Sequence, residues 1–239
     1  MNPMRLLLLI NSTMAGEPYL GWPGNAIRDF LGGNVRSAFF VPFAGIRITW
    51  DDYAGQVGAR FGEWGCEILP AHKSAHPLRE AAEAEAIVMG GGNTFRLVAL
   101  LQESGLLQVI RERVMGGVPY IGWSAGANVA CPTLRTTNDM PVVQPASFET
   151  LGLVPFQINP HFTDAQPPGH GGETRTDRIL EFVEVNPQVP VLGLPEGTGL
   201  RREGGSLELF GTRPARLFVK GAQPQDLSPG APMSFLLRG

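Results

Sequence analysis

The sequence predicts an α/β fold in which helices cover both faces of a mostly parallel sheet. Short apolar runs typical of buried strands alternate from the start with stretches of helical periodicity. Several of these runs end in glycines or small polar residues that open a helix, as expected where a strand passes into a crossover. Because 239 residues are enough for one such unit, we expect a single domain over residues 1–239.

Apolar runs without polar breaks indicate strands that are buried on both faces. In chain order, the expected strands span residues 4–11, 36–44, 66–71, 84–89, 118–123, 156–162 and 189–197. Residues 206–211 and 215–221 are expected to pair as two terminal antiparallel strands. The Pro- and Gly-rich stretch that follows predicts an irregular C-terminal tail over residues 221–239.

The stretches between the strands have the spacing of helices. The expected helices span residues 25–33, 49–65, 77–84, 93–107, 108–117, 125–131 and 171–186. Gly32 and Gly33 are expected to end the first helix, and Thr49 or Asp51 to cap the second.

Composition and charge narrow the classes of partner. A formal net charge of −3, with no cluster of Lys and Arg, predicts no binding to nucleic acid or to an anionic membrane surface. The apolar run at residues 6–10 is shorter than a signal-peptide core, and no run approaches the ~20 apolar residues of a membrane span. We therefore expect a cytoplasmic protein in which Cys66 and Cys131 are small buried side chains rather than a disulfide.

The segment "GWSAG" at residues 122–126 matches G-x-S-x-G, a sharp turn from strand to helix that holds the serine side chain in the open. Five-residue matches also arise by chance, and Ser124 taken alone is an ordinary helix N-cap. The surroundings favour a nucleophile, because an apolar strand leads into Ser124 and small helical residues follow it. We expect a nucleophile elbow after a central strand.

A serine hydroxyl attacks only when a base takes its proton. Of the four histidines, His72 and His76 lie in a polar loop, and His170 lies in a glycine-rich turn. His161 directly follows an expected strand, and reactive groups of open α/β sheets collect at the carboxyl ends of strands. His161 is therefore the predicted general base.

A carboxylate must then orient the imidazole and stabilise its cation. Glu196 lies at the tip of a strand between Pro195 and Gly197, whereas Asp139 lies on the polar segment after the elbow helix. The sequence does not rank these carboxylates by distance. Glu196 is the preferred third member of the triad, and Asp139 stays open as an alternative member or as a substrate ligand.

The glycine run in "MGGGNTF" supplies backbone amides at the end of another strand. We expect Gly91, Gly92 and Ala125 to form an oxyanion hole beside the serine. A glycine-rich turn before a helix also binds phosphate, but the G-x-G-x-x-G spacing and the Walker lysine are absent here.

The residues singled out so far lie in segments that resemble the peptidase E family of α-aspartyl dipeptidases. The resemblance extends over residues 6–197 in family order and spacing, through the segments "INSTMAG", "VPFAGIRITWDDY", "MGGGNTFRL", "YIGWSAGANVACPTLRTTNDMP", "QINPHFTDA", "PPGHGGETRTDRI" and "GLPEG". It implies a class I glutaminase-like α/β fold and a serine hydrolase that needs no metal or other cofactor. It also implies Ser124 as nucleophile and His161 as base, while Glu196 and Asp139 both belong to the family pattern.

The activity that the resemblance implies is cleavage of dipeptides that begin with aspartate. Binding an aspartyl side chain away from water requires a cation, because an unpaired buried carboxylate is costly. Arg175 and Arg178 lie three residues apart on one helix face and are the expected ligands, with Arg135 as a further candidate. Solvated arginines paired with acids of their own helix explain the same pattern. The candidates for the free amino group of the substrate are Asp139, Glu173 and Asn11.

Two other functions stay open at this point. One is a related serine hydrolase that acts on another acidic amide or isopeptide, as cyanophycinase-like enzymes do. The other is a noncatalytic binding or sensor protein on the glutaminase fold. A glutaminase is disfavoured because its elbow nucleophile is cysteine, whereas residue 124 is serine. The expected partner is a small acidic dipeptide, and the sequence does not predict an oligomeric state.

Overall fold

The computed structural model describes residues 3–166, 169 and 171–238, so the glycine-rich turn around His170 lies partly outside it. The strands are β1 (Arg5–Leu9), β2 (Ser37–Val41), β3 (Glu67–Pro70), β4 (Ile87–Met89), β5 (Tyr120–Trp123), β6 (Gln157–Pro160), β7 (Val191–Leu194), β8 (Thr198–Glu203), β9 (Ser206–Gly211), β10 (Ala215–Phe218) and β11 (Gln225–Leu227). The α-helices are α1 (Gly24–Leu31), α2 (Trp50–Gly62), α3 (Pro77–Glu83), α4 (Thr94–Glu103), α5 (Leu106–Met115), α6 (Ala125–Asn128) and α7 (Arg175–Val185). Two short 3₁₀ helices are η1 (Ala71–Lys73) and η2 (Ser234–Leu237).

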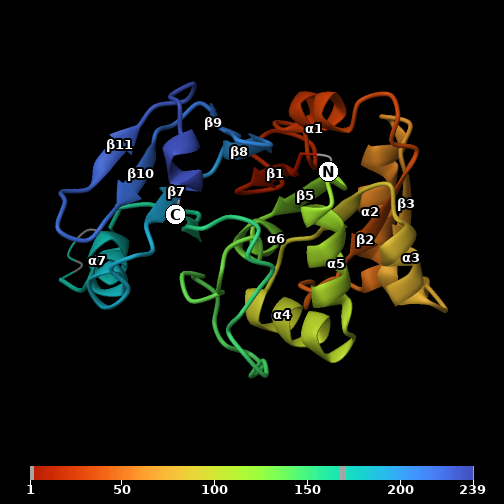
Figure 1. Cartoon of the computed structure of the whole chain (residues 1–239), viewed down its shortest axis with the longest axis horizontal. Coiled ribbons are helices and arrows are strands. Elements are labelled where there is room, and N and C mark those ends of the chain that lie inside the picture. Colours follow the sequence, from red (N-terminus) through yellow and green to blue (C-terminus); the bar gives the residue numbers. More distant parts are fainter. Residues whose placement is uncertain (1–2, 167–168, 170, 239) are drawn as a thin grey trace.

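These strands form two sheets that lie next to each other (Figure 1). The larger sheet has the order β3-β2-β4-β5-β1-β8-β9, and the smaller sheet has the order β11-β10-β7-β6. From β3 to β1 every neighbouring pair of the larger sheet is parallel, and β8 and β9 then add an antiparallel edge. In the smaller sheet β6 and β7 are parallel, so the carboxyl ends of parallel strands are available in both sheets.

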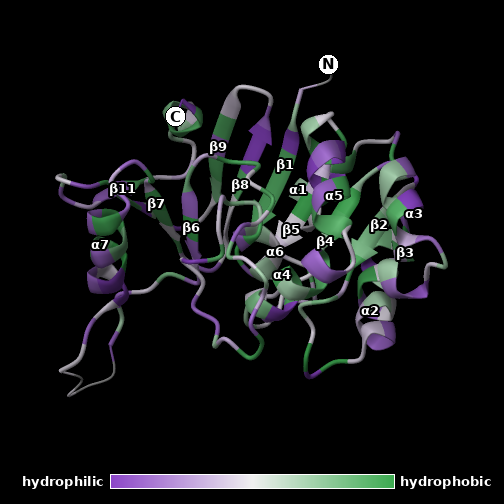
Figure 2. Cartoon of the chain, turned by 60° about the horizontal axis from the view of Figure 1, so that its bottom comes forward, coloured by the Kyte–Doolittle hydropathy of each residue, from purple (hydrophilic) through white to green (hydrophobic). Residues whose placement is uncertain are grey.

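Alternation along β1 explains why the larger sheet is covered on both faces. Leu6 and Leu8 pack into one hydrophobic cluster with α4 and α5, while Leu7 and Leu9 pack into a second cluster with α1 and α2. Successive strand side chains point to opposite faces, and all four of these leucines are buried. Figure 2 shows the hydrophobic colour concentrated in the strands and on the helix faces that cover them. The predicted mostly parallel α/β sheet with helices on both faces is confirmed.

The N-terminal two thirds of the chain agree with the expected element order, with boundaries that differ by a few residues. Thr49 caps α2, since its side chain accepts a hydrogen bond from the amide of Asp52. Asp51, the alternative cap, lies within the first turn of the helix and pairs with Lys73 and His72 instead.

The predicted pairing of residues 206–211 with 215–221 is wrong. β9 pairs with β8 across the two-residue turn Gly204–Gly205, and β10 lies in the other sheet between β7 and β11. The missed strand β8 ends in "RRE", and its partly exposed second half has no apolar run. A half-exposed strand therefore escaped a search for buried strands.

The tail is also more regular than predicted. Residues 221–239 contain β11 and η2, and within them Met233 and Leu236 are buried in the main hydrophobic cluster. The backbone of Met233 donates a hydrogen bond to the carbonyl of Leu207 in β9. Single apolar residues, separated in sequence, anchor this segment to the core. They form no apolar run, so the proline- and glycine-rich composition predicted an irregular tail instead.

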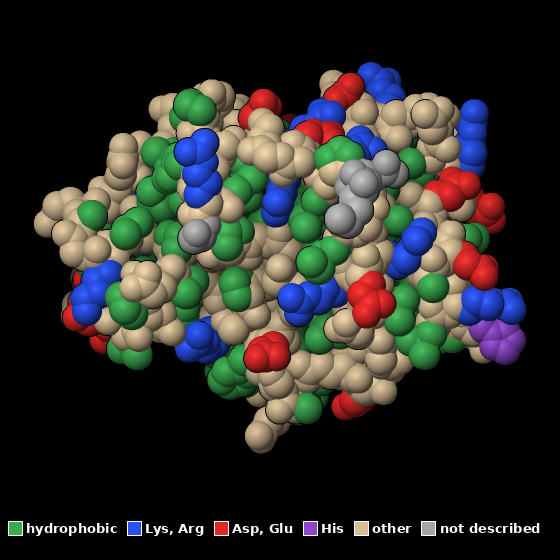
Figure 3. All heavy atoms as spheres, in the orientation of Figure 1, with side chains coloured by type: hydrophobic (Ala, Val, Ile, Leu, Met, Phe, Trp, Pro, Cys, Tyr) green, Lys and Arg blue, Asp and Glu red, His purple; other side chains and the backbone are tan. Residues whose placement is uncertain are grey.

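On the face shown in Figure 3, acidic and basic side chains are scattered among apolar ones and form no large patch of one charge. None of the helices in the described part of the chain has both the length and the apolar character needed to cross a bilayer.

Close backbone packing at the strand-to-helix turn after β5 explains both glycines of "GWSAG". A Cβ atom at Gly126 would lie 2.2 Å from the carbonyl oxygen of Met89, and one at Gly122 would lie 2.4 Å from the carbonyl oxygen of Gly126. Real Cβ atoms do not approach backbone so closely. The turn is therefore possible only with glycine at both positions.

Gly126→Ala should lower the free energy of unfolding by about 1–3 kcal/mol, because β4 and α6 must move apart to admit the methyl group. Gly55→Ala is the matched control, since Gly55 lies in α2 with open space around its Cβ position. The control should be neutral or stabilising by about 0.5–1 kcal/mol. Denaturant unfolding of both variants measures the difference, and equal stabilities would contradict the packing argument.

Candidate active site

Ser124 lies at the turn between β5 and α6, in a backbone conformation that few L-residues adopt. Its φ and ψ angles are 52° and −111°, and its amide donates a hydrogen bond to the carbonyl oxygen of Leu9. The side chain makes no helix-capping hydrogen bond. Its Oγ atom lies 2.9 Å from Nε2 of His161, so the hydroxyl faces a base rather than the helix amides.

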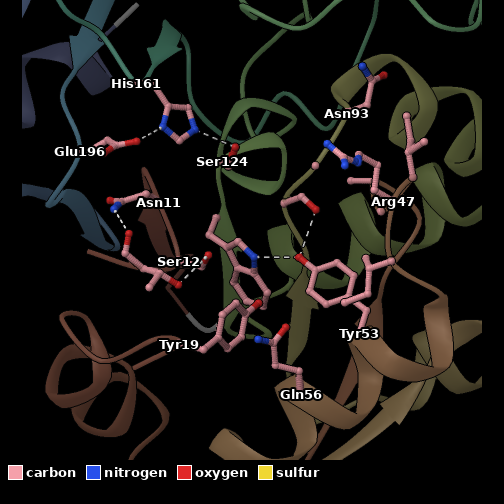
Figure 4. A pocket seen from close by; sticks show the side chains of 18 residues that line it. Asn11, Ser12, Tyr19, Arg47, Tyr53, Gln56, Asn93, Ser124, His161 and Glu196 are labelled. Carbon is pink, nitrogen blue, oxygen red and sulfur yellow. Dashed lines mark hydrogen bonds and ion pairs between the residues drawn. The ribbon is translucent and has the colours of Figure 1, made fainter. Parts of the chain in front are cut away.

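His161 follows β6 of the smaller sheet and also has a positive φ, 54°. Its Nδ1 atom lies 3.1 Å from Oε1 of Glu196. With a proton on Nδ1, the ring donates to Glu196 and leaves Nε2 free to accept from Ser124. The side chains of His161 and Glu196 are 34% and 54% exposed, so both are open to water at the mouth of the site. Figure 4 shows the three side chains in a row.

Glu196 is held by the turn that follows β7. The next residue, Gly197, has a φ of 76° and donates its amide to Oδ1 of Asn11 at 2.8 Å. Asn11 is 5% exposed, and its Nδ2 donates to the carbonyl oxygen of Thr13. The predicted substrate ligand Asn11 thus lines the site, but its Oδ1 bonds to the turn that carries Glu196 and its Nδ2 bonds to its own loop.

Asp139, the alternative acid, lies elsewhere. Its Oδ2 accepts hydrogen bonds from the amide of Thr94 at 2.7 Å, the hydroxyl of Thr94 at 2.6 Å and the hydroxyl of Thr137 at 3.1 Å. These contacts hold the carboxylate at the start of α4. Among the described residues, the carboxylate in contact with His161 is that of Glu196. Asp139 does not contact the imidazole, so the geometry does not support it as the third member of the triad.

The predicted oxyanion residues surround Ser124. A Cβ atom at Gly91 would lie 3.0 Å from the Cβ of Ser124, and one at Gly92, where φ is 137°, would lie 2.2 Å from the carbonyl oxygen of Ala44. Only glycine permits this approach. In the described part of the chain the amides of Gly92 and Ala125 donate to no acceptor, so they remain available to a ligand.

A buried aromatic relay fixes the orientation of this glycine segment. Trp123 Nε1 donates to the hydroxyl of Tyr53 at 2.9 Å, and that hydroxyl donates to the carbonyl oxygen of Gly91 at 3.1 Å (Figure 4). Because a peptide unit is planar, holding the Gly91 carbonyl also fixes the opposite direction of the Gly92 N–H. Burial raises the pKa of Tyr53 to about 12, so its phenol keeps the proton that it donates.

A cleft of about 650 Å³ opens in front of Ser124, within the usual size range of small-molecule sites. In Figure 4, His161 and Glu196 lie on one side of this cleft and Arg47 lies on the opposite side. Tyr19, Trp123 and the loop from Ala44 to Ile48 also line it. This arrangement suits a short peptide that lies across the serine.

The arginines predicted to bind an acidic side chain do not line this cleft. Arg175 donates to the carbonyl oxygens of Pro160 and His161, and its burial together with the neighbouring charge of Arg178 lowers its pKa. Arg178 lies 3.7 Å from Glu173, and both side chains are exposed. The arginines, including Arg135, line a separate pocket of about 390 Å³ with Asp139. Arg175, Arg178 and Glu173, expected around the substrate, are therefore absent from the residues that line the cleft in front of Ser124.

Sequence reasoning missed Arg47, Tyr19 and Gln56, which do line the cleft (Figure 4). Arg47 lies in the loop after the carboxyl end of β2, and Gln56 lies in α2, the helix that follows this loop. The expectation that reactive groups collect at strand ends points to this loop but not to a particular residue in it, whereas Tyr19 lies in an irregular loop that carries no such signal. Within the described ranges, no three His, Cys, Asp or Glu side chains gather closely enough to hold a metal ion.

Comparison with known proteins agrees with this geometry. A family model described as peptidase family S51 matches residues 6–210. A peptidase E from a Nostoc species is 48% identical over 235 residues, covering 98% of this chain and 96% of that protein. A peptidase E from Streptomyces coelicolor is also 48% identical over 235 residues, covering 98% of this chain and 95% of that protein.

A solved structure shares the fold. The crystal structure of a peptidase from an acI-B1 Actinobacterium superimposes with a TM-score of 0.71 at 20% sequence identity, covering 98% of both chains. The chain therefore shares its mostly parallel α/β fold with that peptidase over nearly the whole length of both.

Tyr53→Phe should lower the free energy of unfolding by about 1–3 kcal/mol, because the buried N–H of Trp123 loses its acceptor. Tyr19→Phe is the matched comparison, since the buried hydroxyl of Tyr19 lies close to Tyr53 and Trp123 but forms no hydrogen bond of normal geometry among the described residues. Its removal should change stability little. Chemical denaturation followed by tryptophan fluorescence measures both, and an equal loss in the two variants would refute the relay.

Proposed function

The chain belongs to peptidase family S51, and from this membership we propose that it is a serine exopeptidase that hydrolyses dipeptides with an N-terminal aspartate. The observation that carries the proposal is the row Ser124, His161 and Glu196, with contacts of 2.9 Å and 3.1 Å. These distances are those of a nucleophile, its base and the group that orients the base. Family membership supports a peptidase, and the geometry supports the serine mechanism.

In the proposed reaction, Nε2 of His161 accepts the proton of the Ser124 hydroxyl as Oγ bonds to the carbonyl carbon of the dipeptide. The carbonyl π electrons move onto the oxygen, which gains a negative charge. The free amides of Gly92 and Ala125 are available to donate to that oxyanion. Glu196 stabilises the imidazolium through Nδ1.

Collapse of this intermediate breaks the bond between the carbonyl carbon and the leaving nitrogen, which takes the proton from Nε2 of His161. The aspartyl group remains bonded to Ser124 as an ester. Water then repeats the sequence, with His161 first accepting a water proton and finally returning a proton to Oγ. The partial exposure of the His161 side chain gives water a route to the ester.

Wild-type protein should hydrolyse Asp-Leu much faster than Asn-Leu and N-acetyl-Asp-Leu, because a carboxylate and a free amine are both required. Ser124→Ala should reduce turnover of Asp-Leu by about 10⁶-fold, down to the background left by binding and the oxyanion hole. Product analysis by chromatography measures both. Preferential cleavage of an isoaspartyl dipeptide would instead favour the cyanophycinase-like alternative, and undiminished turnover by Ser124→Ala would exclude the acyl-enzyme.

Glu196→Gln should reduce kcat for Asp-Leu by about 10²–10⁴-fold, because the amide no longer holds the productive imidazole tautomer as an anion does. The lower end of this range reflects the exposure of Glu196, which lets water replace part of the interaction. Asp139→Asn should reduce kcat far less and instead destabilise the start of α4. Steady-state kinetics combined with thermal unfolding separates the two effects, and the reverse ranking would make Asp139 the orienting acid.

A further inference from the structure

Arg47 is the cation of the cleft in front of Ser124. In the described part of the chain it is the only Lys or Arg side chain among the residues that line this cleft, and Glu196 is the only carboxylate. Figure 4 shows its guanidinium reaching into the cleft from the wall opposite His161 and Glu196.

The guanidinium of Arg47 is not neutralised by an acid of the chain. Among the described residues it forms no ion pair, although two carboxylates follow it closely in sequence. Asp51 pairs with Lys73 at 2.9 Å and His72 at 3.0 Å, and Lys73 followed by His72 lowers the pKa of that carboxyl. Asp52 accepts from the hydroxyl of Thr49 at 2.6 Å. The charge of Arg47 is thus available to an anionic ligand.

The loop that carries Arg47 is anchored to the same backbone segment as the oxyanion amides. The amide of Asn93 donates to the carbonyl oxygen of Ala44 at 2.8 Å, and Arg96 donates to the carbonyl oxygen of Gly45 at 3.0 Å. Gly92 packs against Ala44 so closely that no side chain would fit between them. These contacts hold the base of the loop in a constant position relative to Ser124.

The direction of proton transfer decides which end of a substrate meets Arg47. His161 gives its proton to the leaving nitrogen, so the leaving residue must lie against the wall formed by His161 and Glu196. The acyl residue then extends toward the opposite wall, where Arg47 lies (Figure 4). Arg175 bonds to the backbone of His161 and is therefore on the leaving side.

We propose that Arg47 binds the side-chain carboxylate of the N-terminal residue and thereby sets the specificity of the cleft for an acidic acyl group. This inference rests on the proposed function, in which the acyl residue is aspartate. A guanidinium can donate two parallel hydrogen bonds to a carboxylate, whereas the amide of asparagine offers one acceptor and presents donors to the cation. Ile46 and Ile48, the exposed neighbours of Arg47, would shield such a pair from water.

The test compares Arg47→Met, Arg47→Gln and Arg47→Lys with Arg79→Met, which removes an exposed arginine of α3 outside the cleft. Substrates are Asp-Leu, Asp-Leu amide and Asn-Leu, and competitive inhibition by L-aspartate and L-asparagine gives a second readout that needs no turnover of a poor substrate. Arg47→Met and Arg47→Gln should lower kcat/KM for Asp-Leu and for Asp-Leu amide by about 10²-fold. Arg47→Lys should lose less, since it keeps the charge but not the paired donors.

The same Met and Gln variants should change kcat/KM for Asn-Leu by less than about threefold and should abolish the preference of the site for L-aspartate over L-asparagine. Arg79→Met should resemble wild type throughout. A uniform loss on all substrates would mark Arg47 as merely structural, and a loss that disappears on Asp-Leu amide would assign it to the C-terminal carboxylate. Loss of the aspartate preference in Arg175→Met but not in Arg47→Met would also overturn the assignment.

These results remain distinguishable from failure of the proposed function. Failure of the proposed function is measured without any variant of Arg47. It would appear as absent hydrolysis of Asp-Leu by wild-type protein or as full activity in Ser124→Ala. If wild type cleaves Asp-Leu through Ser124 and Arg47→Met keeps its preference for aspartate, only the role of Arg47 is wrong.

Discussion

The hydrogen bond between Ser124 and His161 connects two different sheets, and the rest of the site depends on the sheets keeping their relative position. Ser124 ends a strand of the larger sheet, whereas His161 and Glu196 end strands of the smaller sheet. A shift of one sheet by an ångström would break a 2.9 Å contact. Asn11, after β1 of the larger sheet, accepts a hydrogen bond from Gly197, in the turn that joins β7 of the smaller sheet to β8 of the larger sheet, and so helps to hold this turn in place. One hydrophobic cluster that includes strands of both sheets packs behind these polar contacts.

The two residues that exchange a proton in the proposed reaction both have a strained backbone. In the described part of the chain Leu20, Ser124 and His161 are the non-glycine residues with positive φ angles, which cost about 1–3 kcal/mol each. Hydrogen bonds around each residue hold the strained forms, from the amide of Ser124 to Leu9 and from Arg175 to the carbonyl of His161. Arg175 therefore has a clear structural task at the base, which explains an arginine at this position without any contact to substrate.

The cleft is electrostatically asymmetric although the chain as a whole carries a formal net charge of −3. The carboxylate of the cleft, Glu196, contacts the imidazole of His161, while its cation, Arg47, lies on the opposite wall. In the proposed function, a substrate with a negative acyl side chain meets the positive charge of Arg47 at one end and the proton donor His161 at the other. Such a separation selects orientation as well as affinity, because a reversed peptide would place its carboxylate beside Glu196.

The sequence alone determined most of the elements and the reactive residue types, because their signals are local. Unbroken apolar runs predicted the buried strands, the glycines of "GWSAG" predicted the sharp turn, and strand ends predicted Ser124, His161 and Glu196 as candidates. The choice between Glu196 and Asp139 was decided only by the tertiary structure, since both acids follow ordered elements and differ in which neighbour the packing brings to them. The same holds for the arginines. Arg175 and Arg47 are alike as residues, and only the topology of two sheets directs one to a backbone carbonyl and the other into the cleft.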